Sequence, residues 1–319
     1  MFDVNMTEPP ICTCVDCGRG DILCGGLWKG FGYTSRDLKT KDVHIVVSHC
    51  KESLRWISDF TAGCNNIVSM HVLTKCREPV EGAPDFAEFI SLPNKGRCDH
   101  SYVSYILNYM EERINPDAII FFLKDTLPWK PNSFEVMLES ASSARGFACG
   151  IAHKDIQRIG QGSYDLSLFH KTNDIMKFSI GGYSSQRRYG ADDTNFKSGF
   201  TNLGDFYNQT LGPLLDTTLP ELMPVCYRGN FAASVSNIRK VSRKVWEALE
   251  MSLSRGNNIE EGHFAERLWG ILLATPLRPY QITALWNHAG HNVLNLSTIG
   301  ITGVLGIQGN LSAGERPTQ

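Results

Sequence analysis

Residues 41–60 read KDVHIVVSHCKESLRWISDF and contain the first clear strand and helix pattern of the chain. Residues 43–47 form an apolar, largely β-branched run, which is typical of a strand buried on both faces of a sheet. Residues 52–60 then carry apolar side chains three positions apart, on one stripe of a helix. A strand followed at once by an amphipathic helix is the unit from which α/β domains are built.

The same alternation of strands and helices continues along the chain. Further strands are expected at 67–73, 89–92, 118–123, 225–227 and 231–235, and further helices at 99–113, 133–144, 241–254 and 259–273. At this spacing the strands join into a parallel sheet through right-handed crossovers, with helices on its faces. The predicted fold class is therefore α/β and Rossmann-like, with a mostly parallel sheet flanked by helices and with inserted loops.

The domain organisation follows from where this alternation stops. Residues 1–40 are rich in Gly, Cys and Pro without sustained periodicity, and we expect a Cys-rich loop arm there. Residues 41–288 form the α/β domain, in which 151–222 is a loop-rich insertion with aromatic, Gly and Arg clusters. Residues 289–319 are rich in Gly, Asn, Ser and Thr and are expected to form a flexible tail.

The composition is that of an ordinary globular protein, with 42% hydrophobic and 20% charged residues in a chain of 319. The formal net charge of −2 provides no basic field for a nucleic-acid backbone, so we expect no nucleic-acid partner. No run of about 18 apolar residues predicts a transmembrane segment, and no basic-then-apolar leader is visible. We therefore expect a cytoplasmic protein by default, with the Golgi lumen or secretion as the alternative.

Cysteine is the exception in this composition, with ten residues. Four of them lie close together near the N-terminus, at Cys12, Cys14, Cys17 and Cys24. These four contain a single Cys-x-x-Cys pair, so free thiols or a local disulfide are favoured over a zinc site. The other six lie in or beside apolar runs, as buried free thiols do. An Asn-x-Ser/Thr sequon, relevant only in the secretory pathway, begins at each of Asn5, Asn208, Asn295 and Asn310.

Several enzyme classes are made improbable by the motifs that this sequence lacks. It contains no G-x-x-x-x-G-K-[ST] phosphate loop and no G-x-G-x-x-G dinucleotide fingerprint. It also contains no H-E-x-x-H zinc-protease motif and no G-x-S-x-G nucleophile elbow. A P-loop NTPase, a dehydrogenase, a zinc protease and a serine hydrolase are thus each disfavoured.

The loops that follow the predicted strands are the expected binding region, because ligands of open α/β sheets bind beyond the carboxyl ends of the strands. The polar residues of these loops are Ser48, His49, Asn94, Gly96, Arg97, Lys124 and Asp125. We expect them to line one cleft, in which Arg97 could contact a phosphate through two hydrogen bonds and Asp125 could bind Mg or Mn. A solvated turn arginine and a turn-initiating aspartate are the structural alternatives for these two residues.

Three stretches of the sequence, spanning roughly residues 43–275, resemble a eukaryotic family. They read IVVSHCKESLRWI, LPNKGRCDHSYVSYILNYMEERINPDAIIFFLKD, and CYRGNFAASVSNIRKVSRKVWEAL with EEGHFAERLWGIL. The family is domain-of-unknown-function family 3431, which is similar to glycosyltransferases of the GT-A type. The resemblance implies a GT-A-like fold and transfer of a sugar from a nucleotide sugar to a hydroxyl of a glycan or another acceptor. A catalytically inactive relative that binds a glycan or a protein through 151–222 is the main alternative, and another nucleotide-binding protein, such as a methyltransferase, is the second.

The resemblance also implies roles for individual residues. The strand-end residues Ser48, His49, Asn94, Gly96, Arg97 and Lys124 would hold the nucleotide sugar, and Asp125 would hold Mg or Mn. On the closing helix, Glu266 would be the catalytic base, with Glu261 as the second candidate and His263 beside them. The chain departs from the pattern in having Cys98 where the family tends to place Glu, and Lys124-Asp125 in place of Asp-x-Asp. Lys124 could therefore offset diphosphate charge in place of a metal.

Overall fold

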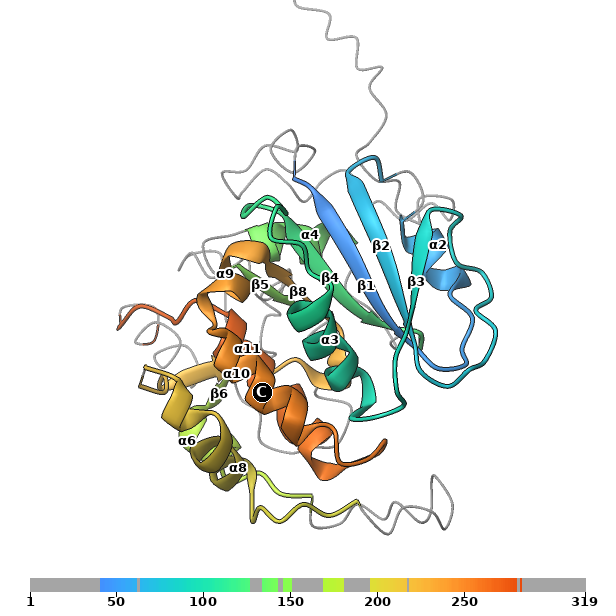
Figure 1. The fold of residues 1–319 in the computed structure, drawn as a ribbon. Helices are drawn as coiled ribbons and strands as arrows, with labels where there is room; N and C mark the ends of the chain where they lie inside the picture. The colour runs from blue at the N-terminus through green and yellow to red at the C-terminus, as the bar shows by residue number, and fades with distance from the viewer. Residues whose placement is uncertain are drawn as a thin grey trace, which may run out of the picture.

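The computed structural model describes residues 41–61, 64–126, 134–142, 146–150, 169–180, 196–216, 218–279 and 282 (Figure 1). The predicted Cys-rich arm, the four cysteines considered for zinc and the predicted tail all lie outside these residues. Residues 151–168, 181–195 and 217 of the predicted 151–222 insertion also lie outside them. No helix in the described part of the chain is both long enough and apolar enough to span a membrane.

The core of the fold is a six-stranded sheet with the order β3-β2-β1-β4-β8-β5. Its strands are β1 (Val43–His49), β2 (Ile67–Thr74), β3 (Ala87–Ser91), β4 (Ile119–Lys124), β5 (Phe147–Cys149) and β8 (Phe231–Ser234). The first four run parallel to one another, and β8 runs antiparallel to both β4 and β5. The predicted α/β fold with a mostly parallel sheet is confirmed, while the direction of β8 departs from the parallel alternation.

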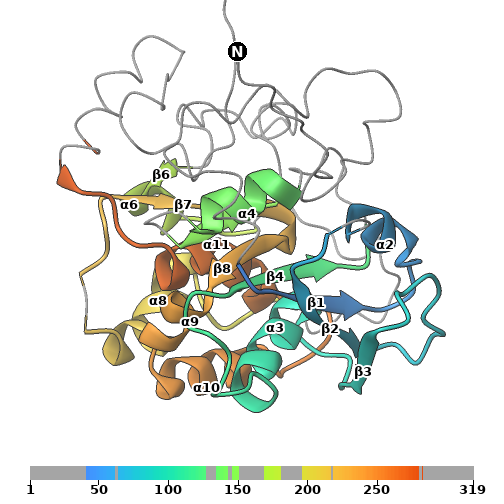
Figure 2. The same cartoon turned by 90° about the horizontal axis from the view of Figure 1, so that it is seen from above.

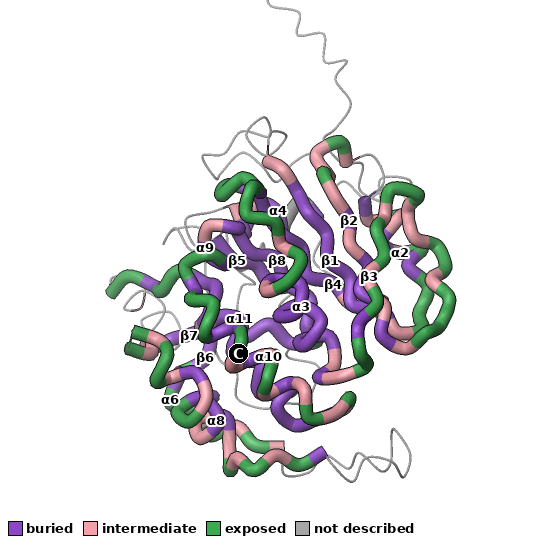
Figure 3. Tube along the Cα trace, in the orientation of Figure 1, coloured by how far each residue is buried: buried purple, intermediate pink, exposed green. Residues whose placement is uncertain are grey.

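Helices cover both faces of this sheet (Figure 2). On one face α2 (Arg55–Thr61) and α4 (Phe134–Ser142) pack on side chains such as Ile45 and Phe121. On the other face Val46 and Phe122 belong to the core that includes the remaining long helices, α3 (Arg97–Asn108), α10 (Arg243–Ser252) and α11 (Glu260–Leu273). The strands β1 and β4 are therefore buried along nearly their whole length (Figure 3).

Smaller elements complete the described fold. They are α6 (Thr172–Ile175), α8 (Leu203–Thr210), α9 (Val235–Lys240), the short helices η4 (Gly212–Leu214) and η5 (Tyr227–Gly229), and a two-stranded antiparallel sheet of β6 (Phe169–Lys171) and β7 (Leu222–Pro224). The strand predicted at 225–227 is wrong, because β7 ends at Pro224 and a short helix follows. The helix predicted from residue 52 begins three residues later, at Arg55, because the amides of residues 50–52 bind Asp125 instead.

Two disulfides tie the loops to the sheet. Cys50–Cys76 joins the ends of β1 and β2, and Cys149–Cys226 joins β5 to the segment that precedes η5. Cys64 is also disulfide-bonded, whereas Cys98 is a buried free thiol. The prediction of free thiols is thus correct for Cys98 and wrong for Cys50, Cys64, Cys76, Cys149 and Cys226.

Candidate functional site

The turn before α3 fixes the position of Arg97. Gly96 and Arg97 have positive φ angles of 51° and 55°, and a Cβ atom on Gly96 would lie 2.4 Å from the carbonyl oxygen of Leu253. The buried Lys75 amine donates hydrogen bonds to the carbonyl oxygens of Lys95 and Arg97. Because Leu253 and Lys75 both restrict this turn, the guanidinium of Arg97 lies at the carboxyl-terminal edge of the sheet.

Arg97 meets α11 at this edge. Its Nη1 donates a 2.7 Å hydrogen bond to Nδ1 of His263, and its Nη2 lies 3.9 Å from Oε2 of Glu266. Burial, together with the charges of Arg97, Arg267 and Lys124, lowers the pKa of His263 to about 2. His263 is therefore neutral at physiological pH and accepts a hydrogen bond from Arg97, which leaves Nδ1 unsuited to proton transfer.

Lys124 brings a second positive charge to the same cluster. It ends β4, pairs in register with Ser48 of β1, and its backbone N–H donates to Oδ1 of Asn230 at 2.8 Å. Its ammonium is close enough to contribute to the lowered pKa of His263. We define the Arg97 cluster as Arg97, Lys124, His263 and Glu266.

The Arg97 cluster lies at the point where the strand order reverses. From β1 the chain proceeds outward through β2 to β3, and β4 then returns to the opposite side of β1. The carboxyl ends of the two strands at such a switch point form the usual ligand crevice of an open α/β sheet. Ser48 and Lys124 are the paired residues at these two ends.

A buried carboxyl group beside the cluster was missed by the sequence analysis as a site residue. Asp99 is fully buried in the first turn of α3, and Oδ1 accepts a 2.8 Å hydrogen bond from Nε1 of Trp269. Burial raises the pKa of Asp99 to about 6 even though Arg97 acts in the opposite direction. Gly96, and not Asp99, occupies the N-cap position of α3.

The two candidate bases have different surroundings. Both carboxylate oxygens of Glu261 bind Arg255, at 3.0 and 2.7 Å, so this buried residue anchors the start of α11. Glu266 is 6% exposed, and its Oε1 lies 3.5 Å from Nη1 of Arg267 while Oε2 faces Arg97. Of the two, Glu266 is the carboxylate that belongs to the Arg97 cluster.

The remaining predicted binding residues are not gathered in the same way. Ser48 is buried, and its hydroxyl bonds to that of Ser101 at 2.9 Å. His49 is 1% exposed, and within the described part of the chain neither ring nitrogen has a hydrogen-bond partner. Asn94 lies exposed on the turn before Gly96. The structure thus brings together only part of the set that the sequence proposed.

Asp125 clamps a loop. Its Oδ2 accepts hydrogen bonds from the backbone amides of Cys50, Lys51 and Glu52 at 2.8, 3.0 and 3.2 Å. Its carbonyl oxygen accepts a further bond from Nε1 of Trp56 at 2.7 Å. Oδ2 is therefore engaged by the loop, while Oδ1 accepts a hydrogen bond from the hydroxyl of Thr126 at 3.3 Å. The role of metal ligand expected for Asp125 stays a prediction. The described residues contain no group of three His, Cys, Asp or Glu side chains that could hold a metal ion.

We expect Asp125→Asn to lower the free energy of unfolding by about 2 kcal/mol at pH 7, because three amides lose a charged acceptor. Burial alone would raise the pKa of Asp125, but the three backbone hydrogen bonds outweigh it and lower the pKa. The stabilisation is therefore present above the unfolded pKa of about 4 and is lost as the pH falls through the folded value.

Urea unfolding at pH 7 and at successively lower pH measures this contribution. The difference between wild type and Asp125→Asn should shrink on acidification, while Asp117→Asn, at an exposed position, should match wild type throughout. Equal free energies of unfolding for Asp125→Asn and Asp117→Asn at pH 7 would show that the hydrogen bonds to Asp125 do not stabilise the fold.

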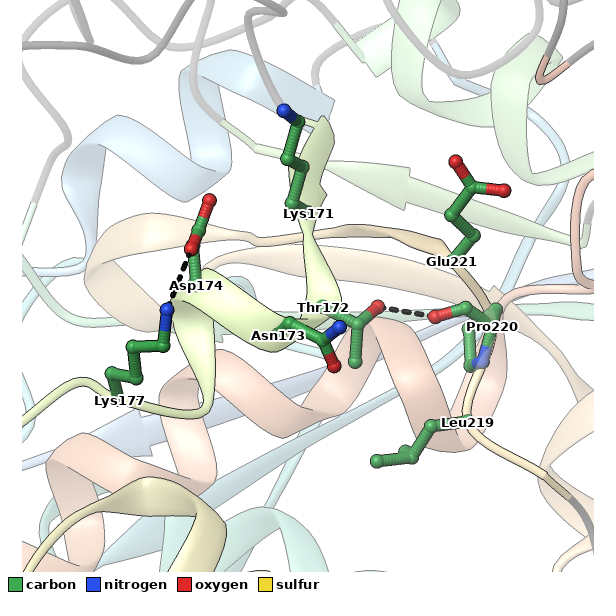
Figure 4. Close-up of a pocket in the computed structure, with 8 residues that line it drawn as sticks. All are labelled: Lys171, Thr172, Asn173, Asp174, Lys177, Leu219, Pro220 and Glu221. Atoms are coloured by element: carbon green, nitrogen blue, oxygen red, sulfur yellow. Dashed lines mark hydrogen bonds and ion pairs between the residues drawn. The ribbon is translucent and has the colours of Figure 1, made fainter.

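A surface hollow of about 700 Å³ lies elsewhere, beside β6 and α6 (Figure 4). Its lining includes Lys171, Asp174, Lys177 and Glu221, and Lys177 pairs with Asp174 at 3.2 Å. The Lys177 and Asp174 side chains are 76% and 65% exposed, so their pairing is strongly screened by solvent. No residue of the Arg97 cluster lines this hollow.

Comparisons of the chain with protein-family models, with curated proteins and with solved structures return no match.

Proposed function

We propose that the protein is a glycosyltransferase of the GT-A type that transfers a sugar from a nucleotide sugar to a hydroxyl acceptor. The observation that carries this proposal is the presence of Arg97 and Lys124 together at the carboxyl ends of β1 and β4. Two cations at a switch point suit the diphosphate of a nucleotide sugar, because both the ground state and the leaving group are anionic. The four-strand parallel part of the sheet is consistent with this class.

In this proposal, Arg97 and Lys124 neutralise the departing nucleoside diphosphate without a metal on Asp125. Glu266 is the group that accepts the proton of the acceptor hydroxyl, since Glu261 is bound by Arg255 and His263 accepts from Arg97. Glu266 lies between two guanidiniums, and it reaches the acceptor only if Arg97 turns toward the diphosphate on binding.

Binding of nucleoside diphosphates, measured by calorimetry with and without EDTA, tests the donor site. We expect Arg97→Gln and Lys124→Met each to weaken binding by about tenfold or more, because a charge-assisted hydrogen bond contributes about 1.5–3 kcal/mol. Arg113→Gln and Lys244→Met, both at exposed positions, are the matched controls and should bind like wild type. EDTA should have little effect.

Binding that survives both substitutions would contradict this donor site. Binding that is lost in EDTA would also contradict it. In either case the diphosphate lies elsewhere or depends on a metal.

A catalytically inactive binding protein is the second candidate, and it is favoured by the burial of Glu266 and by the engagement of Asp125. Glu266→Gln separates the two. A transferase should lose turnover of the nucleotide sugar while still binding the diphosphate. A wild-type protein that binds nucleotide sugars but neither transfers nor hydrolyses them with any acceptor would be the inactive relative.

A further inference from the structure

An exposed sequon lies on α8, outside the Arg97 cluster. Asn208, Gln209 and Thr210 form Asn-Gln-Thr in the last turn of this helix. The helix buries Leu203, Phe206 and Tyr207, and it leaves Asn208 and Gln209 on the opposite, exposed face. The side-chain amide of Asn208 makes no hydrogen bond within the described part of the chain. Its nitrogen is therefore open to solvent and has no structural task in the fold.

The buried face of α8 shows that a large group on Asn208 is compatible with the fold. Phe206 packs against Phe264 of α11, with ring centroids 5.5 Å apart. It also packs edge-on against Phe200 at 5.2 Å. Because these contacts lie on the side opposite Asn208, a substituent on Asn208 would extend into solvent without displacing the core.

The disulfides supply the second, independent observation. Cys50–Cys76 and Cys149–Cys226 are both formed, and disulfides persist in secreted proteins and in the lumen of the secretory pathway rather than in the reducing cytosol. This is also the compartment in which Asn-x-Ser/Thr sequons are glycosylated. The bonded cysteines favour the secretory alternative over the cytoplasmic default that the sequence suggested.

We propose that Asn208 is a site of N-linked glycosylation. The reaction joins Nδ2 of Asn208 to the anomeric carbon of a lipid-diphosphate-linked oligosaccharide, and the bond from that carbon to the diphosphate breaks. The lipid diphosphate leaves with the bonding electron pair, and the proton lost from the amide nitrogen is taken up by the base of the host oligosaccharyltransferase. The inference does not rest on the proposed transferase activity of the chain.

The test is expression of the full chain, directed into the secretory pathway of a eukaryotic cell, followed by peptide mapping. Trypsin releases residues 198–228 as one peptide, in which Asn208 begins the only sequon. Deglycosylation with peptide N-glycosidase in heavy-oxygen water converts a glycosylated Asn to labelled Asp, so we expect the label on Asn208. Mapping without reduction should recover the Cys149–Cys226 bond from the same sample.

Three variants make the result specific to the sequon. Asn208→Gln and Thr210→Ala should each lose the label and the corresponding mobility shift. Thr210→Ser preserves the sequon and should keep both. The proposal is overturned by an unlabelled Asn208 in protein whose disulfides are formed, by secreted protein in which Cys149 and Cys226 are reduced, or by label that persists in Thr210→Ala.

Discussion

Replacing Cys149 and Cys226 together by alanine is expected to lower the free energy of unfolding by about 4.5 kcal/mol, from the chain-entropy estimate for a loop of this length. The disulfide joins residues separated by 77 positions, so its removal releases a long loop in the unfolded chain. Both cysteines are nearly fully buried, and alanine leaves no unpaired polar group in their place. Urea unfolding of the wild type and the double variant measures the difference.

The second disulfide provides the matched comparison. Cys50 and Cys76 are separated by 26 positions, so the Cys50→Ala/Cys76→Ala variant should lose less, about 3.5 kcal/mol. A reducing agent should lower the stability of the wild type by more than it lowers that of a variant lacking these four cysteines, which retains the disulfide of Cys64. Insensitivity of the wild type to reduction would show that the bonds are not formed in solution.

The central strands could be predicted because they are buried on both faces. The runs at β1 and β4 are rich in apolar side chains, and their lengths and the helices between them indicate a parallel sheet. The direction of β8 could not be predicted in this way. Its four residues, FAAS, are all buried, and a fully buried strand has the same pattern whether its neighbours run parallel or antiparallel.

Part of the Arg97 cluster could be predicted from the rule that ligands bind at strand ends. Arg97 follows β3 and Lys124 ends β4, and Lys124 lies at the switch point while both charges act on His263. Asp125 shows the limit of that rule, because the sequence places a carboxylate at a strand end without giving the direction in which it points. Asp99 shows that the rule also misses residues beside the cluster. An acidic residue in the first turn of a helix has the sequence pattern of a cap, even where its side chain is buried against Trp269.

The disulfides were beyond what this sequence could specify. Cys149 lies in the apolar stretch FAC and Cys226 follows Val225, and the same apolar context suits a free buried thiol. Pairing depends on which loops the fold brings to within a few ångströms, and the spacing of the cysteines does not contain that information.

Gly270→Ala is expected to lower the free energy of unfolding by about 3 kcal/mol, at the upper end of the usual range for overpacking. Gly270 is buried in α11, and a Cβ atom there would lie 1.9 Å from the carbonyl oxygen of Pro224 at the end of β7. Because this neighbour is backbone, the clash cannot be relieved by a side-chain rotation, and either α11 or β7 has to move. Without this clash, alanine would stabilise the helix by about 1 kcal/mol relative to glycine. The sign of the change in the free energy of unfolding therefore shows whether the clash is present.

Two other glycines serve as controls for this substitution. A Cβ atom on Gly199 has nothing within 4 Å, so Gly199→Ala should leave the urea midpoint nearly unchanged. Gly262 lies on the same helix as Gly270, but its Cβ atom would approach Cδ of Arg97, at 3.0 Å, rather than backbone. Gly262→Ala should therefore fold with nearly wild-type stability and yet weaken nucleoside diphosphate binding, because Arg97 has to move aside. If Gly270→Ala instead proves as stable as wild type, the close approach of α11 to β7 is refuted, and with it the packing that holds His263 and Glu266 against Arg97.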